Sequence, residues 1–134
     1  VEPAIGAQRM DKVYAWKSML DMGIHTSGGS DAPVVSFDAM ENIYFAVTRK
    51  NISGQPQEGW IPSEKMSVDE AVKLFTKNAA YASYTEKENG TIETGKNADL
   101  VVLEKDIYSI DPDEIKTVKV DMTVLGGKVV FERE

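Results

Sequence analysis

Residues 23–33 read GIHTSGGSDAP, a short stretch in which an apolar start gives way to glycine, serine, aspartate and proline. The two glycines at 28–29 accept unusual backbone dihedrals, and the proline at the end opposes continuation of a strand. Serine and aspartate favour turns because their side chains bond to nearby backbone groups. We therefore expect a short strand over 24–27 that stops abruptly. Asp31 lies in the loop after it, where closing a turn is its simplest role.

Helical patterns lie on both sides of this stretch. Residues 9–22 carry apolar side chains at intervals of three and four, and Gly23 follows, which is typical of an amphipathic helix with a C-terminal glycine. Residues 37–49 repeat the helical spacing, with Ser36 as the expected N-terminal cap. The order helix, strand, loop, helix predicts an α/β unit that places Asp31 beyond the C-terminal end of a strand.

A long irregular segment separates this unit from a third helix. Residues 51–66 are rich in Gly, Pro and polar side chains without a period, which predicts an exposed loop of a length typical of a lid or an insertion. Ser67 and Glu70 form the S-x-x-E pattern of a capping box. The apolar spacing that follows predicts a helix that continues towards Tyr84.

After Gly90 the hydrophobic pattern changes from helical to extended. Residues 99–104 are almost continuously apolar, and residues 117–125 alternate, so both predict strands. The glycines at 126–127 predict a two-residue hairpin turn into a third strand over 128–131. A meander of three strands leaves unpaired edges and an uncovered face, so this sheet is expected to need partners.

The composition is that of an ordinary globular protein, with 42% hydrophobic and 28% charged residues in a chain of 134. No apolar run approaches the ~20 residues of a membrane span. With 22 acidic against 15 basic residues the net charge is −7, which argues against a phosphate-binding surface. We therefore expect neither a membrane nor a nucleic-acid partner.

The chain contains no cysteine and a single histidine, His25. The absence of cysteine excludes disulfides and Cys-ligated metal sites within the chain, and it agrees with a cytoplasmic location. Because histidine is the commonest general base and metal ligand, a hydrolytic site made by these residues alone would depend on carboxylates. His25 has no cysteine or second histidine beside it, so we expect it to be structural or to face solvent.

Three stretches, taken together, resemble one protein family. Residues 23–33 resemble the last barrel strand and loop of the metal-dependent amidohydrolases, the superfamily that includes urease and dihydroorotase. Residues 67–82, SVDEAVKLFTKNAAYA, resemble the helix that follows. Residues 90–103, with the ending TVLGGKVVF at 123–131, resemble the small β-sandwich domain of these enzymes. Order and spacing are similar to amidohydrolase family 3, the branch of the N-substituted formamide deformylases.

The resemblance implies a (β/α)₈ TIM barrel with an attached β-sandwich built from both chain ends. Such a barrel normally needs ~250 residues, so we expect this α/β chain to be a C-terminal fragment. Residues 1–89 are then expected to form the last β/α units of the barrel. Residues 90–134 are expected to form the C-terminal part of the composite β-sandwich.

The resemblance also implies an activity, the metal-dependent hydrolysis of carbon–nitrogen bonds other than peptide bonds in small amides or cyclic amides. Asp31 matches the family's Asp after the eighth strand, which implies a ligand to a divalent metal, zinc, and a catalytic acceptor for the proton of the attacking water. The other family ligands, including a His-x-His pair, have no counterpart here. A catalytic zinc needs three or four protein ligands, so the fragment alone is expected to bind no metal and to be inactive.

Other interpretations remain open at this point. The full-length protein can be an amidohydrolase-like protein without catalysis that acts in regulation or binding, or the chain can be an independent α/β binding module. Trp60 can line a substrate pocket or pack locally, and Arg49 can meet a substrate carboxylate or serve the end of its helix. A fragment with exposed barrel and sheet surfaces is also expected to form a homo-oligomer.

Overall fold

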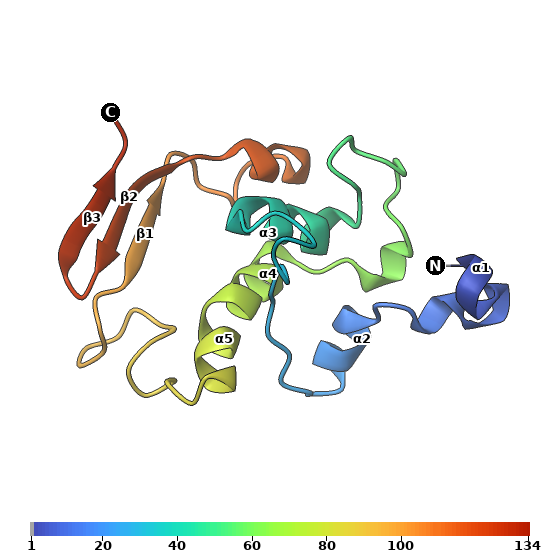
Figure 1. Cartoon of the computed structure of the whole chain (residues 1–134), viewed down its shortest axis with the longest axis horizontal. Helices are drawn as coiled ribbons and strands as arrows, with labels where there is room; N and C mark the ends of the chain where they lie inside the picture. Colours follow the sequence, from blue (N-terminus) through green and yellow to red (C-terminus); the bar gives the residue numbers. More distant parts are fainter. Residues whose placement is uncertain (1) are drawn as a thin grey trace.

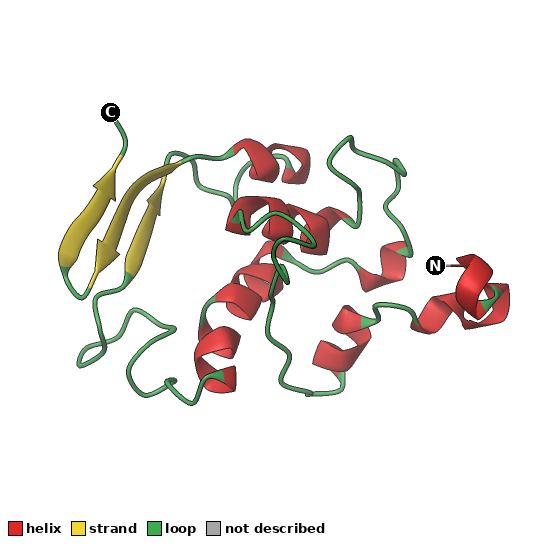
Figure 2. Ribbon diagram, in the orientation of Figure 1, coloured by secondary structure: helices red, strands yellow, loops and turns green. Residues whose placement is uncertain are grey.

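The computed structural model describes residues 2–134 (Figure 1), and its helices and its sheet occupy separate parts of the molecule (Figure 2). The N-terminus lies at the helical end and the C-terminus beside the sheet. In chain order the elements are α1 (Glu2–Ile5), 3₁₀ helix η1 (Ala7–Lys12), α2 (Trp16–Asp21), α3 (Ala39–Thr48), η2 (Pro62–Glu64), α4 (Val68–Phe75), α5 (Lys77–Ala82), β1 (Leu100–Leu103), η3 (Pro112–Thr117), β2 (Val120–Leu125) and β3 (Lys128–Glu132).

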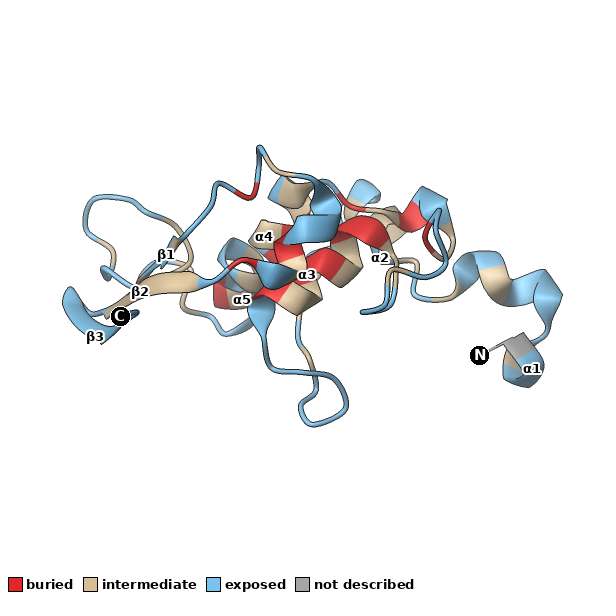
Figure 3. Cartoon of the chain, turned by 90° about the horizontal axis from the view of Figure 1, so that it is seen from above, coloured by how far each residue is buried: buried red, intermediate tan, exposed pale blue. Residues whose placement is uncertain are grey.

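The hydrophobic core is centred on α3, which packs against both η3 and α4. Ile43, Tyr44 and Val47 recur at helical spacing and are buried on one face of α3. Figure 3 shows the buried residues gathered along α3 and α4. Tyr44 of α3 and Ile115 of η3 are both fully buried. The core therefore joins the middle of the chain to a segment about 70 residues further on.

The N-terminal cap of α3 is not the residue that the sequence predicts. Asp38, and not Ser36, is the N-terminal cap, because its carboxylate accepts a hydrogen bond of 2.8 Å from the Met40 N–H. The Ser36 hydroxyl instead accepts a bond from the backbone of Asp38. At the other end Arg49 takes a left-handed conformation, with φ of 58°, and its N–H donates to the Phe45 carbonyl.

The single helix expected over 9–22 is wrong, because the chain forms η1 and then α2 with a break between them. Tyr14 lies in the break with φ of 51°, a conformation that interrupts any right-handed helix. The expected C-terminal glycine is confirmed. Gly23 has φ of 77°, and hydrogen bonds from Gly23 to the Leu20 carbonyl and from Ile24 to the Met19 carbonyl complete a Schellman motif.

The capping box at the start of α4 is confirmed, since the Ser67 hydroxyl accepts from the Glu70 N–H and the Glu70 carboxylate accepts from the Ser67 N–H. The continuous helix expected over 67–84 is wrong. Thr76 interrupts it with φ of −125° and ψ of −95°, and α5 ends at Ala82. None of the helices between residues 2 and 134 combines the length and the apolar character that crossing a bilayer requires.

The strand expected over 24–27 is also wrong, because these residues are irregular and pair with no strand. The segment instead lies along α4 and α5, where the Gly28 N–H donates to the Leu74 carbonyl and the Asn78 amide donates to the Thr26 carbonyl. The approach at Gly28 is close, since a Cβ there would lie 2.6 Å from the end of the Phe75 ring and the ring would have to shift. A strand needs a neighbour to pair with, and the described residues supply none on either side.

The loop over 51–66 is less exposed than expected. It contains η2, and two of its side chains are buried, with Glu64 at 4% and Met66 at 5% exposure. Met66 joins the core beside α3, and its N–H donates to the Ala46 carbonyl. The loop is therefore fixed to the helical core at its C-terminal end.

The sheet is the expected antiparallel meander, in the order β1-β2-β3. Gly126 and Gly127, with φ of 55° and 78°, form the predicted two-residue turn. β2 begins at Val120 and not at 117, because η3 occupies the preceding residues. The β2–β3 register shifts so that Thr123 faces Phe131 while Val124 faces Val129, which leaves the residue at position 130 without a partner.

We expect Ile115→Ala to lower the free energy of unfolding by ~3 kcal/mol, because it removes a fully buried side chain from the contact between α3 and η3. Ile92→Ala is the matched control, since Ile92 is 88% exposed and its loss is expected to change stability by less than ~0.5 kcal/mol. Urea unfolding followed by circular dichroism measures both. Equal midpoints for the two variants would contradict the assigned core.

Candidate functional site

Asp31 lies in an exposed turn, with φ of 49°. Its carbonyl accepts a hydrogen bond of 2.9 Å from the Val34 N–H, and the Ser30 carbonyl accepts one from Val35. Within residues 2–134 no hydrogen bond or ion pair holds the Asp31 carboxylate. The backbone of Asp31 thus closes a turn, as its residue type predicts, and its side chain is left available to solvent.

The described residues do not form a complete metal centre by themselves. Residues 2–134 contain no group of three or more His, Asp or Glu side chains placed to hold one ion. His25 is exposed, and its ring stacks on that of Tyr81 with a centroid distance of 4.2 Å, in agreement with the expected structural or solvent-facing role.

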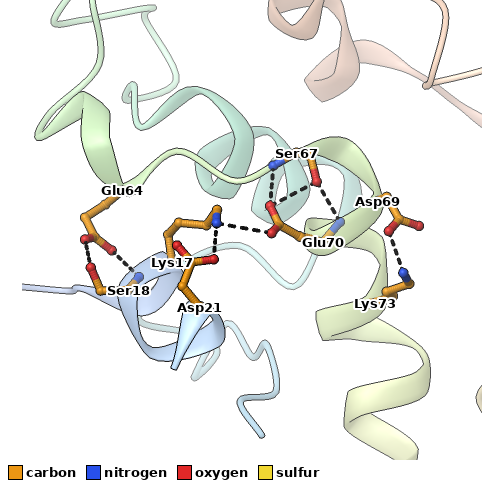
Figure 4. A network of polar contacts seen from close by, with 8 residues as sticks. All are labelled: Lys17, Ser18, Asp21, Glu64, Ser67, Asp69, Glu70 and Lys73. Atoms are coloured by element: carbon orange, nitrogen blue, oxygen red, sulfur yellow. Dashed lines mark hydrogen bonds and ion pairs between the residues drawn. The ribbon is translucent and has the colours of Figure 1, made fainter. Parts of the chain in front are cut away.

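A network of polar contacts ties α2 to the segments that precede and begin α4 (Figure 4). The buried Glu64 carboxylate accepts hydrogen bonds from the backbone N–H of Ser18, at 3.0 Å, and from the Ser18 hydroxyl. Lys17 forms ion pairs with Asp21 and with Glu70, the latter at 3.3 Å. Sequence reasoning missed Glu64, because nothing in its local sequence indicates burial and its partner lies 46 residues away.

The environment of Glu64 lowers its pKa. Burial alone would raise the pKa of this carboxyl, because it disfavours the charged form. The hydrogen bonds from the Ser18 hydroxyl and backbone, with the positive charge of Arg49, outweigh burial and hold the pKa below its ordinary value. Glu64 is therefore a buried anion that links α2 to η2.

Arg49 joins three segments of the chain. Its Nε donates to the Trp60 carbonyl at 3.0 Å, and its Nη1 donates to the Tyr14 carbonyl at 3.2 Å. The guanidinium also lies over the Trp60 ring, 5.1 Å from the centroid. Burial lowers the pKa of Arg49, an effect that the charge of Glu64 partly offsets. Arg49 is therefore partly buried, and its side chain connects the end of α3 to Trp60 and Tyr14.

Two hollows meet at Arg49 and Phe45. The first, of about 290 Å³, is also lined by Tyr14 and Trp60, whose rings pack edge to face at 5.9 Å. Trp60 therefore packs against Tyr14 and also lines a hollow, so both interpretations of this residue stay open. The second hollow, of about 390 Å³, lies between residues 26–29 and helices α3 and α4. Asp31 and His25 do not line either hollow, whereas Arg49 lines both.

Comparison with known proteins identifies the family of this chain. The sequence model of the amidohydrolase family matches residues 1–131. The chain belongs to the amidohydrolase family. This confirms the resemblance of residues 23–33, 67–82 and the C-terminal stretches.

Two relatives show how far the match extends. YtcJ from Bacillus subtilis (strain 168), an amidohydrolase by its name, is 38% identical over 96% of this chain and 24% of its own length. The N-substituted formamide deformylase of Arthrobacter pascens is 36% identical over 91% of this chain and 22% of its own length. The chain therefore spans about a quarter of the length of the curated relatives that it matches.

The fold is similar to that of a solved amidohydrolase. The crystal structure of an amidohydrolase from Thermotoga maritima MSB8 superposes with a TM-score of 0.64 and 23% sequence identity. The match covers 92% of this chain and 26% of that protein. The mixture of helices and strands therefore follows an amidohydrolase arrangement, as the family resemblance predicts.

The lowered pKa of Glu64 predicts an acid-sensitive contact. A carboxylate with a depressed pKa in the folded state stabilises the protein above its unfolded-state pKa of about 4.3, and this contribution is lost as the pH falls through the folded-state value. We expect Glu64→Gln to lower the free energy of unfolding by ~2 kcal/mol at pH 7, and the difference from wild type to narrow towards pH 3.

Urea unfolding at several pH values measures this effect. Glu58→Gln is the matched control, because Glu58 is exposed in the same loop and its loss is expected to leave stability at pH 7 unchanged. If the Glu64 and Glu58 variants behave alike at every pH, the Ser18 contact does not stabilise the fold.

Proposed function

We propose that the chain is the C-terminal part of a metal-dependent hydrolase that cleaves carbon–nitrogen bonds other than peptide bonds in small amides or cyclic amides. The observation that carries this proposal is the family match over residues 1–131. The names of two relatives point the same way, since one is an N-substituted formamide deformylase and another is a 5-methylthioadenosine/S-adenosylhomocysteine deaminase from Caldanaerobacter subterraneus, 29% identical over 87% of this chain.

The proposal gives Asp31 two roles, as one ligand of a divalent metal, zinc, and as the acceptor of the proton of the attacking water. Its carboxylate is exposed and so is available for both roles. The remaining ligands would come from segments outside these 134 residues, so the chain alone is proposed to be inactive. The same proposal places residues 1–89 in a TIM barrel and residues 90–134 in a β-sandwich of a cytoplasmic enzyme.

In the full-length protein that carries this chain, we expect Asp31→Asn to lower hydrolysis of N-substituted formamides at least ~100-fold and to reduce the bound divalent metal. The amide of asparagine removes the negative charge while keeping the size of the side chain. Asp11→Asn, at an exposed position outside the 23–33 stretch, is the matched control and should retain activity and metal.

Elemental analysis and a product assay measure the two effects, and circular dichroism verifies the fold. Full activity of the Asp31 variant would contradict the proposed catalytic role of Asp31. The assignment to the family would stand, because it does not depend on this residue. A metal-free, inactive full-length protein would instead favour a role in regulation or binding.

We further propose that the isolated chain forms a homo-oligomer through its sheet. Val101, Thr123 and Phe131 lie directly opposite one another across the three strands and so share one face. Val101 is 57% exposed and Phe131 is 49% exposed. The neighbouring Leu125 is 60% exposed. Exposed apolar surface of this kind favours association.

Light scattering after size exclusion tests this association. We expect the wild-type chain to elute as a species larger than one chain and Phe131→Ser to shift it towards the monomer. Tyr84→Ser is the control, because Tyr84 is 93% exposed but lies outside the sheet. A wild-type monomer at high concentration would contradict the proposal.

A further inference from the structure

Two buried hydrogen-bonding atoms without partners belong to residues that line the same hollow. Among the described residues, Thr26 Oγ1 and Arg49 Nη2 are buried without any hydrogen bond, and both residues line the hollow of about 390 Å³. A buried polar group left unpaired costs roughly 1–3 kcal/mol, and such groups are rare in native proteins. Because both residues line one hollow, a ligand bound there can supply the missing bonds once small side-chain movements bring the two atoms to its surface.

The guanidinium of Arg49 is held by two of its three nitrogens, and the third, Nη2, forms no hydrogen bond. Nε and Nη1 are fixed by the carbonyls of Trp60 and Tyr14. Within residues 2–134 no carboxylate lies within ion-pair distance of Arg49, and the charge of Glu64 offsets only part of the lowering of the Arg49 pKa by burial. Because a partly buried cation is stabilised by an anion that accepts its hydrogen bonds, the chemistry of this position favours a carboxylate.

The rest of the hollow suits a small organic group. Phe45, Leu74 and Phe75 provide apolar walls, and Asn42 and the glycines at 28–29 provide a polar edge. No atom lies within 4 Å of the position that a Cβ of Gly29 would take, so the space beside this edge is open. A volume of this size lies within the ~300–1,000 Å³ of ordinary small-molecule sites.

We propose that this hollow binds the carboxylate of a small organic acid with an apolar substituent. Arg49 Nη2 and the Thr26 hydroxyl donate to the two carboxylate oxygens after side-chain rotations of the kind common on binding. The substituent packs against Phe45 and Phe75. The proposal concerns binding alone, so it does not depend on hydrolysis or on Asp31.

Phenylacetate and its neutral analogue phenylacetamide are suitable probes, used with the 134-residue chain and with the full-length protein that carries it. Isothermal titration measures binding, and fluorescence gives a second readout because Trp16 lines the hollow. We expect phenylacetate to bind with a Kd on the order of 1 mM and phenylacetamide at least ~10-fold more weakly.

Two variants and two controls separate the ligand contact from effects on the fold. Thr26→Val keeps the shape of the side chain and should weaken phenylacetate binding ~10-fold, while Arg49→Lys, which loses Nη2, should weaken it at least as much. Thr94→Val and Arg9→Lys, at exposed positions away from the hollow, should bind as wild type.

Arg49→Lys also loses the contacts with Trp60 and Tyr14, so Thr26→Val decides the test if the lysine variant fails to fold. Equal binding of phenylacetate and phenylacetamide would overturn the proposal, as would a Thr26→Val variant that binds as wild type. Binding by the chain that disappears in the full-length protein would overturn it too, because other segments would then fill the hollow.

Discussion

The packing of α3 against η3 is the contact on which the rest of the structure depends. It brings Tyr44 and Ile115, both fully buried, into one core although they lie about 70 residues apart in the sequence. Lys116 extends the contact, since its ammonium lies 4.5 Å from the centre of the Tyr44 ring and donates to the Ile52 carbonyl. Because η3 leads directly into β2, this contact also anchors the sheet to the helices. Loss of the contact would also free the start of the loop after α3, where Lys116 bonds to Ile52.

The functional region depends on the same core through short backbone contacts. The segment before Asp31 is held by Gly28 against Leu74 and by Thr26 against Asn78, so its position follows that of α4 and α5. Arg49 in turn extends from the end of α3 and fixes the distant segment at Tyr14. The loop of Asp31, the Arg49 side chain and the hollow that Arg49 lines are therefore all positioned by the packed helices α3, α4 and α5. The loop that carries Asp31 is oriented by backbone bonds, while its own side chain stays unconstrained.

Sequence reasoning succeeded where the determining interactions are local. The capping box of Ser67 and Glu70 and the paired glycines of the hairpin each act within a few residues, so their patterns suffice. It failed where a partner lies far away in the chain. Tyr14 leaves the helical conformation in a segment held by Arg49, and the burial of Glu64 depends on Ser18, 46 residues away. The role of Asp31 came from family resemblance, because an aspartate in a turn looks the same whether or not it takes part in catalysis.

The shift of register between β2 and β3 has a consequence for how this chain meets other copies. At the residue left without a partner, the outer strand departs from a regular ladder, which makes its edge a poor template for a further strand. Val101, Thr123 and Phe131 still lie opposite one another on one face of the sheet. The association proposed above would therefore use the face of the sheet, because addition of a further strand at the irregular β3 edge is disfavoured.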